Sequence, residues 1–201
     1  MHSEAANIST DDYILVEKCR KGDPAGLERL ILKYQDRVYN VILKMCSNPD
    51  DAAELTQETF VKVIENIDKF EGRSGIYTWI FRIGVNLTLT HCKRSLKLGF
   101  KSLDVDFEDC DEGIRSNLKN LLVDKKSADP MVISQKREIY EITMKALMKL
   151  DDAHRAVVVL KDIEGMSYAG ISKVMDIELG TVKSRLSRSR VNLRDILEAM
   201  F

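Results

Sequence analysis

Apolar residues recur three and four positions apart through most of the chain, from about residue 11 to residue 96 and again from about residue 131 onward. Leu27, Leu30 and Ile31 begin one such series. Side chains with this spacing lie on one face of a helix, so the pattern predicts amphipathic helices. No segment shows the convincing alternation of polar and apolar residues that a half-buried strand has. The hydrophobic pattern therefore predicts an all-α protein.

Proline and glycine mark where these helices are expected to begin. Asp23-Pro24 and Asn48-Pro49 each place a capping side chain directly before a proline. Proline suits the first helical position because the N–H that it lacks would have no partner there. The loop "EGRSG" at 71–75 predicts a third break.

The helical pattern fades after about residue 97. The stretch 104–112 has six acidic residues in nine, a composition typical of a solvated linker. We therefore expect two small helical domains joined by a flexible acidic linker. The expected ranges are 10–96 for the first domain, 97–133 for the linker and 134–201 for the second domain.

The stretch "SYAGISKVMDIELGTVKSRLSRSR" in the second domain has the form of a helix-turn-helix. A short first helix is expected at Tyr168–Met175, burying Ile171 together with Val174 or Met175. The residues DIELG then turn the chain. A second helix is expected to begin near Thr181, whose hydroxyl can cap it.

The second helix of this motif divides into an apolar face and a basic face. At about 100° per residue, the apolar side holds Val182, Leu186, Leu193 and Leu197. The opposite side and its flanks hold the residues that could contact DNA. These are Thr181, Lys183, Ser184, Arg185, Ser187, Arg188 and Arg190. Arginine and lysine neutralise phosphates and bond guanine edges, and such a helix enters the major groove. A plain solvated face would usually include acidic residues, so the pattern favours DNA.

A helix expected at 77–94 in the first domain also carries two kinds of face. The side expected to face the core holds Trp79, Ile80, Ile83 and Leu87. Arg82, Asn86 and Thr90 recur on another face, which ends in Lys93 and Arg94. A basic, amide-bearing face beside a loop and aromatic rings could hold unstacked single-stranded bases. An ordinary surface helix after a glycine-rich turn explains the pattern equally well.

The helix expected after Asn48 carries an acidic face. Asp51, Glu54, Gln57 and Glu58 share that face with Asp50, while Ala53, Phe60, Val61 and Ile64 are expected to turn inward. A negative face repels DNA, so its functional interpretation is a surface for docking a protein. A merely solvated face is the alternative.

Together these stretches resemble the extracytoplasmic-function (ECF) group of bacterial sigma-70-type sigma factors. Residues 50–94 look like sigma domain 2, and residues 150–197 look like sigma domain 4. Gly170 departs from the pattern, because a good helix former is expected there, and Ser187 is smaller than is common on the reading face. The linker is also long for the group.

The resemblance implies a role for each surface. The acidic face around Asp51, Glu54, Gln57 and Glu58 would dock on core RNA polymerase. The melted −10 element would be captured by Arg73, Ser74, Tyr77, Trp79, Arg82, Asn86, Thr90, Lys93 and Arg94. The −35 element would be read as duplex by Thr181, Lys183, Ser184, Arg185, Ser187, Arg188 and Arg190. The linker would pass through the basic channel of the polymerase.

The resemblance also implies partners. Core RNA polymerase and promoter DNA are expected, together with an anti-sigma factor that covers the docking and reading faces. A net charge of −1 is low for a solitary DNA-binding protein but fits a subunit that binds promoters within a larger enzyme. A compact form of the free chain, with the acidic linker lying on the basic helix at 183–194, is a further hypothesis.

Other functional classes have little support in the sequence. We find no GxSxG, HExxH or phosphate-loop motif and no cluster of His or Cys, so no enzyme, metal or cofactor is expected. The N-terminus lacks the order of a signal peptide, and no apolar run approaches the roughly 18 residues of a membrane span. We expect a cytoplasmic protein with no membrane insertion of its own. A stand-alone helix-turn-helix regulator remains the alternative function.

Overall fold

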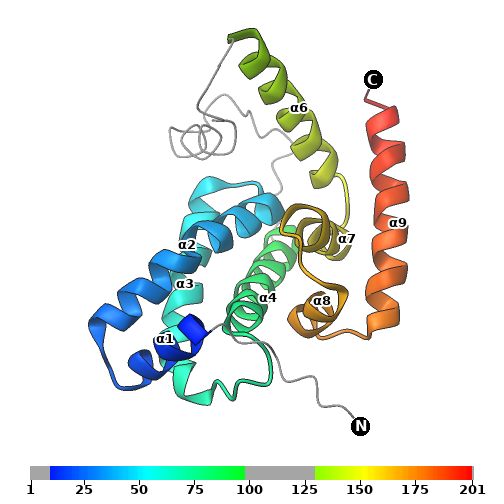
Figure 1. Ribbon diagram of the computed structural model, residues 1–201. Coiled ribbons are helices and arrows are strands. Elements are labelled where there is room, and N and C mark those ends of the chain that lie inside the picture. Colours follow the sequence, from blue (N-terminus) through cyan, green and yellow to red (C-terminus); the bar gives the residue numbers. More distant parts are fainter. Residues whose placement is uncertain (1–9, 98–129, 201) are drawn as a thin grey trace.

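The computed structural model describes residues 10–97 and 130–200, and all regular elements in these ranges are helical (Figure 1). This confirms the all-α class. The acidic stretch 104–112 and most of the expected linker lie outside the described residues. We call helices α1 to α4 the N-terminal lobe and helices α6 to α9 the C-terminal lobe.

Two helices of the N-terminal lobe begin at Pro24 and Pro49, as the capping residues and prolines predicted. The elements of this lobe are α1 (Thr10–Arg20), α2 (Pro24–Cys46), α3 (Pro49–Asn66), a 3-10 turn (Ile67–Lys69) and α4 (Ile76–Lys97). The Asp23 carboxylate accepts a 3.0 Å hydrogen bond from the N–H of Ala25. The Asn48 side chain accepts from the N–H groups of Asp50 and Asp51. These bonds satisfy donors that have no partner inside the helix.

The C-terminal lobe contains the expected helix-turn-helix. Its elements are α6 (Pro130–Met148), α7 (Asp152–Val158), a π-helical turn (Val159–Ile163), α8 (Tyr168–Met175) and α9 (Leu179–Glu198). Helix α8 has the predicted bounds, and its N-cap is Ser167, whose hydroxyl accepts from the N–H of Gly170 at 3.0 Å. Ile171 and Val174 are buried, as predicted.

The start of α9 differs from the prediction. Thr181 is not its cap, because the helix already begins at Leu179 with Glu178 as N-cap and no side-chain capping bond. Asp176 adopts a left-handed conformation with a φ of 54°. That single residue reverses the chain at the end of α8, so the turn is shorter than the sequence suggested.

The inward face of α3 was also predicted wrongly in part. Phe60 is buried, but Val61 and Ile64 are 51% and 41% exposed, and Ala53 is exposed too. The buried side instead holds Ala52, Leu55, Thr59, Phe60 and Val63. Thr59 can lie in the core because its hydroxyl donates to the carbonyl of Leu55 at 2.6 Å. The apolar pattern could not show that this polar side chain turns inward.

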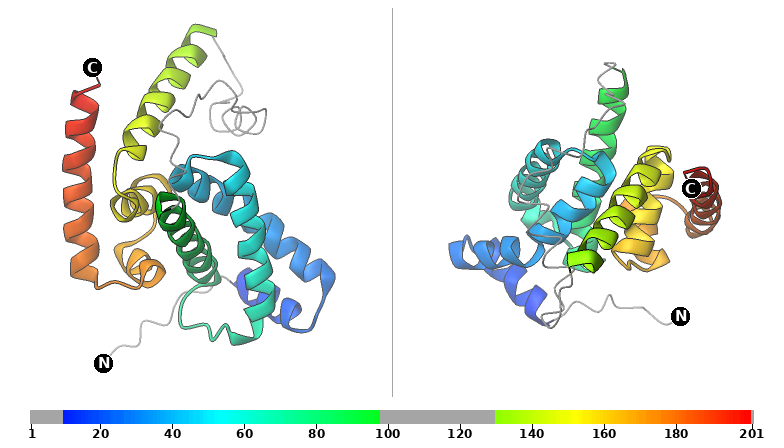
Figure 2. Two further views of the ribbon diagram at one scale, coloured as in Figure 1. Left: turned by 180° about the vertical axis from the view of Figure 1, so that it is seen from behind. Right: turned by 90° about the horizontal axis from the view of Figure 1, so that it is seen from above.

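Helix α4 lies at the centre of the molecule. Helices α2 and α3 cover one side of it, and α7 and α8 cover the other, as the views in Figures 1 and 2 show. Ile80 and Phe81 of α4 are at most 1% exposed, and one continuous hydrophobic core includes them together with Ile171 and Val174 of α8. The two lobes therefore share a packed interface.

Arg155 ties the lobes together inside this interface. Its side chain is 1% exposed. The guanidinium donates to the carbonyl oxygen of Leu147 in the last turn of α6, to that of Leu150 just after this helix, and to that of Met45 at the end of α2. Carbonyl groups at helix C-termini lack partners within the helix and carry partial negative charge. One buried cation thus caps a helix of each lobe.

Candidate nucleic-acid interface

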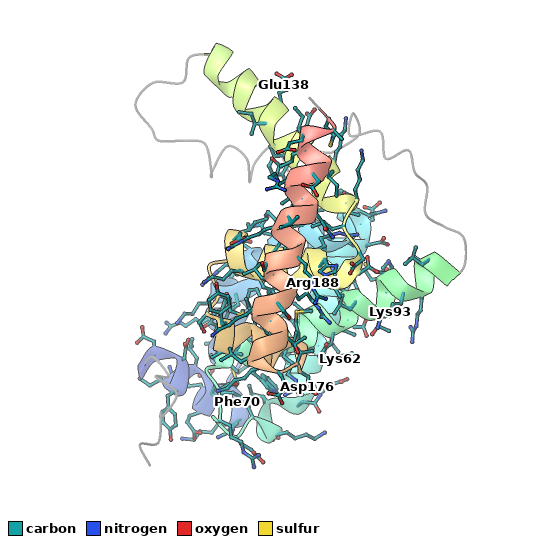
Figure 3. All side chains as sticks on the ribbon, turned by 90° about the vertical axis from the view of Figure 1, so that its right-hand side faces the viewer. Lys62, Phe70, Lys93, Glu138, Asp176 and Arg188 are labelled. Atoms are coloured by element: carbon teal, nitrogen blue, oxygen red, sulfur yellow. The ribbon has the colours of Figure 1, made fainter. Side chains whose placement is uncertain are left out.

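Helix α9 presents the basic face that its sequence predicted. Val182 and Leu186 are buried against the lobe. Arg185 is partly exposed, and the fully exposed residues of the predicted set are Thr181, Lys183, Ser184, Ser187, Arg188 and Arg190. Arg188 lies about midway along the helix (Figure 3). Within residues 10–97 and 130–200, no carboxylate forms an ion pair with Lys183 or Arg188, so both cations can meet phosphate or base edges.

Arg190 differs from these residues because it is held by its own lobe. Its guanidinium donates to both carboxylate oxygens of Asp162, at 3.1 and 2.5 Å. This hydrogen bonding to Asp162 raises the pKa of Arg190 above its ordinary value. The pair fixes the side chain on the flank of α9. Asp162 was not predicted as a partner of Arg190, because no local pattern links residues 28 positions apart.

The start of α4 gathers several of the residues predicted for single-stranded DNA. A cavity of about 200 Å³ is lined by Arg73, Ser74, Thr78, Trp79, Arg82 and Lys173. The Trp79 ring lies 5.3 Å from the ring of Phe70, centroid to centroid. The cavity thus combines cations, hydroxyls and an aromatic wall, which is the chemistry that holds phosphates and unstacked bases. Four of its six residues belong to the predicted set.

Tyr77, which was predicted beside them, is turned toward the other lobe. Its ring packs on Phe81 at 4.4 Å, and its hydroxyl donates to the Glu164 carboxylate at 2.8 Å. Burial and this hydrogen bond to Glu164 raise the pKa of Tyr77. In this arrangement Tyr77 does not line the cavity at the start of α4.

The remaining predicted residues of α4 form an exposed polar stripe. Asn86, Thr90, Lys93 and Arg94 are all exposed. The Thr90 hydroxyl donates to the backbone carbonyl of Asn86 at 2.8 Å. Lys93 lies toward the far end of α4 (Figure 3). The stripe therefore continues from Arg82 along the helix.

The acidic face of α3 is exposed apart from one residue. Glu54, Gln57 and Glu58 face solvent. Asp51 is partly buried, and its carboxylate lies 3.2 Å from the ring nitrogen of His91 on α4. Asp51 thus links α3 to α4, while Glu58 lies 3.4 Å from the Lys62 ammonium of its own helix.

Two other kinds of site are absent from the described part of the chain. No three residues among its His, Cys, Asp and Glu side chains lie together as metal ligands would. None of its helices is long and apolar enough to span a membrane.

Similarity to known proteins identifies the family of this chain. The family description "Sigma-70 region 2" matches residues 30–97, and "Sigma-70, region 4" matches residues 140–193. Over 179 residues the chain is 29% identical to the ECF RNA polymerase sigma-E factor of Salmonella typhimurium, covering 89% of this chain and 90% of that protein. The chain belongs to the ECF group of the sigma-70 family. The resemblance predicted from its motifs is confirmed.

This sigma factor has further relatives over nearly its whole length. It is 28% identical to the RNA polymerase sigma-H factor of Pseudomonas aeruginosa over 193 residues, which are 94% of this chain and 95% of that protein. The matches run through both lobes and the segment between them. They support the function of a sigma factor over that of a stand-alone regulator.

Solved structures share its fold. CnrH, solved in complex with the cytosolic domain of CnrY, matches with a TM-score of 0.63 at 21% identity, covering 94% of this chain and 99% of CnrH. The sigma factor RpoE of Bartonella quintana, solved with the anti-sigma factor NepR, matches with a TM-score of 0.61 at 22% identity. That match covers 85% of this chain and 96% of RpoE. These likenesses establish the two-lobed helical fold.

Proposed function

We propose that this sigma factor reads the −35 promoter element with the basic face of α9. The observation that carries the proposal is the exposure of Lys183, Ser184, Ser187 and Arg188 on the second helix of a helix-turn-helix. The buried residues Val182 and Leu186 fix the rotation of α9, so that the serine, lysine and arginine side chains point away from the lobe. Arg190, held by Asp162, is suited to contact a phosphate at the edge of the site.

The −10 element is bound as a melted strand at α4. Arg73, Arg82 and the stripe from Asn86 to Arg94 supply charge and hydrogen bonds for the backbone and base edges. The cavity lined by Ser74 and Trp79 receives an unstacked base. Tyr77 becomes available to this site only after Glu164 releases its hydroxyl.

Core RNA polymerase docks on the exposed acidic face of α3. Glu54, Gln57 and Glu58 contact it directly, and Asp51 supports the face through His91. Residues 10–96 form the domain for docking and the −10 element, and residues 134–201 form the −35 domain. An anti-sigma factor is the expected inhibitor, since the sigma factor RpoE was solved with such a partner.

In vitro transcription tests these assignments. The purified chain is added to bacterial core polymerase on a pool of promoter-length DNA, beside an Arg82→Ala/Asn86→Ala variant and an Arg188→Ala variant. Transcripts with defined starts are expected from the wild type and should be strongly reduced in both variants. Arg194→Ala is the matched control, because Arg194 lies on α9 but pairs with Asp195 at 2.9 Å. Tight duplex binding without any core-dependent transcript would support a stand-alone regulator instead.

A further inference from the structure

Glu164 of the C-terminal lobe is inserted into the N-terminal lobe. Its carboxylate accepts from the Nε atom of Arg37 at 2.7 Å and from the Tyr77 hydroxyl at 2.8 Å. The Arg37 guanidinium also lies over the Tyr77 ring, 4.7 Å from its centroid. The Glu164 side chain is only 11% exposed. A carboxylate this buried is stable only while its cation and donor stay in place.

A second group of contacts lies over the cavity at the start of α4. The Asp176 carboxylate at the end of α8 is 3.6 Å from the guanidinium of Arg82. The Lys173 ammonium of α8 donates to the backbone carbonyl of Arg73 at 3.3 Å. Asp176 lies below the first turn of α9 in Figure 3. The helix-turn-helix thus touches the surface proposed for the −10 strand.

The two carboxylates among these contacts, Asp176 and Glu164, oppose DNA binding at α4. A phosphate that approached Arg82 would meet the Asp176 carboxylate, and like charges at close range repel. The Glu164 carboxylate meanwhile accepts the hydrogen bond of the Tyr77 hydroxyl, so this hydroxyl is not free to donate to DNA. The exposed side chain of Arg37, 52% accessible, leaves the Glu164 pair open to water and to competing partners on one side.

We propose that the free sigma factor rests in a closed state, in which α8 contacts the −10 surface at the start of α4 and the ion pair between Glu164 and Arg37 strengthens the interface between the lobes. The inference rests on the proposed role of α4 in binding the −10 strand. It differs from masking by the acidic linker, because both contact groups come from the lobes themselves. Binding to core polymerase and promoter then requires the lobes to separate.

Charge reversal at Glu164 tests the closed state without DNA or polymerase. Glu164→Arg places a cation against Arg37, so the radius of gyration from small-angle scattering should rise. Amide exchange should accelerate at the start of α4 and in α8. The charge swap Arg37→Glu/Glu164→Arg should restore the compact radius and slow exchange, which distinguishes opening from misfolding. Glu138→Arg, an exposed reversal on α6, is the matched control.

Binding of a labelled random-sequence 12-nucleotide single strand to the free chain tests the masking. The affinity of Glu164→Arg should exceed that of the wild type about fivefold or more, the size of an ordinary coupling between sites, and the swap should return it to the wild-type value. An unchanged radius and exchange pattern in Glu164→Arg would overturn the closed state. Opening without a gain in affinity would overturn the masking. Failure of the transcription experiment would remove the proposed function but leave the opening measurement unaffected.

Discussion

Several charged side chains in this sigma factor form hydrogen bonds with backbone groups as well as ion pairs with one another. Arg155 bonds the carbonyl ends of two helices and lies 3.2 Å from the Asp152 carboxylate. Asp151 accepts from the N–H groups of Ala153 and His154 at the start of α7, both at 3.0 Å. In each case one side chain satisfies several groups that the helix geometry leaves without partners.

Replacing Arg155 by methionine should destabilise the whole chain strongly. The Leu150 carbonyl and the Asp152 carboxylate would lose their buried partner, so we expect the free energy of unfolding to fall by about 3 kcal/mol or more. Urea unfolding followed by circular dichroism measures the loss. Arg194→Met, on an exposed pair, should change stability by about 0.5 kcal/mol or less. Equal effects of the two variants would contradict the role of Arg155.

Removing the cap at Asp151 should lower the free energy of unfolding by an amount that depends on pH. Burial alone would raise the pKa of Asp151, but the hydrogen bonds from His154 lower it below its ordinary value. Its contribution is therefore fully present above the unfolded pKa of about 3.9 and is lost as pH falls through the lower folded value. Asp151→Ala should cost about 1 kcal/mol at pH 7.

Urea unfolding of Asp151→Ala and the wild type between pH 7 and pH 3 follows this difference. The difference in the free energy of unfolding between the wild type and Asp151→Ala should become smaller as the pH falls below about 4. Asp151→Asn is the control, since its amide oxygen keeps the capping bonds without the charge. A gap that stays constant with pH would show that the charge contributes nothing.

At the scale of elements, close packing explains two glycines that helix propensity does not. Gly170 was unexpected within α8. A Cβ atom added there would lie 2.8 Å from Cγ of the buried Met166 and 3.3 Å from the capping hydroxyl of Ser167. Gly26 of α2 likewise faces Lys18 of α1, with an added Cβ only 2.5 Å from the Cβ of Lys18. Gly26 thus lets α1 approach α2 closely, and Gly170 leaves room for the side chains of Met166 and Ser167.

Gly170→Ala should therefore destabilise the chain, although alanine is favoured in a helix by up to about 1 kcal/mol. The added methyl group would displace Met166 and the Ser167 cap. Gly180→Ala in the first turn of α9 is the matched control, because no atom lies within 4 Å of its added Cβ, and it should be neutral or stabilising. Thermal unfolding compares the two. Equal stability of both variants would mean that α8 adjusts to the methyl group without cost.

At the scale of the whole molecule, the lobes are joined by a common core and by polar contacts. The core continues from α4 into α8, and Arg155 and Glu164 each bond groups of the N-terminal lobe. A domain that shares its core with another loses stability when that neighbour unfolds. The free chain should therefore unfold as one cooperative unit.

The single tryptophan of the chain, Trp79, allows this to be measured. Its fluorescence reports the N-terminal lobe, and far-ultraviolet circular dichroism reports all helices. The two urea transitions should coincide in the wild type and separate in Glu164→Arg, where the ion pair between the lobes is lost. Separate transitions in the wild type would show that the lobes are independent in solution.

Much of the fold could be predicted because its signals are local. The starts of α2 and α3 follow from a capping residue and a proline beside it, and the bounds of α8 follow from eight consecutive residues. The basic face of α9 was likewise visible, since the rotation of a helix is fixed by its own apolar residues. The buried face of α3 was predicted only in part. Thr59 lies in the core because a hydrogen bond to its own helix satisfies its hydroxyl, and the apolar pattern does not show this.

The sequence by itself determined the helices, their order, the family and the chemistry of the exposed faces, because each of these depends on neighbouring residues. The tertiary structure alone decided which charges meet. Glu164 and Arg37 are 127 positions apart, and Arg155 and Met45 are 110 apart. No local pattern specifies such pairs, because they form only when the packing of α4 against α7 and α8 brings the lobes together. That packing also places the Asp176 carboxylate beside Arg82 on α4.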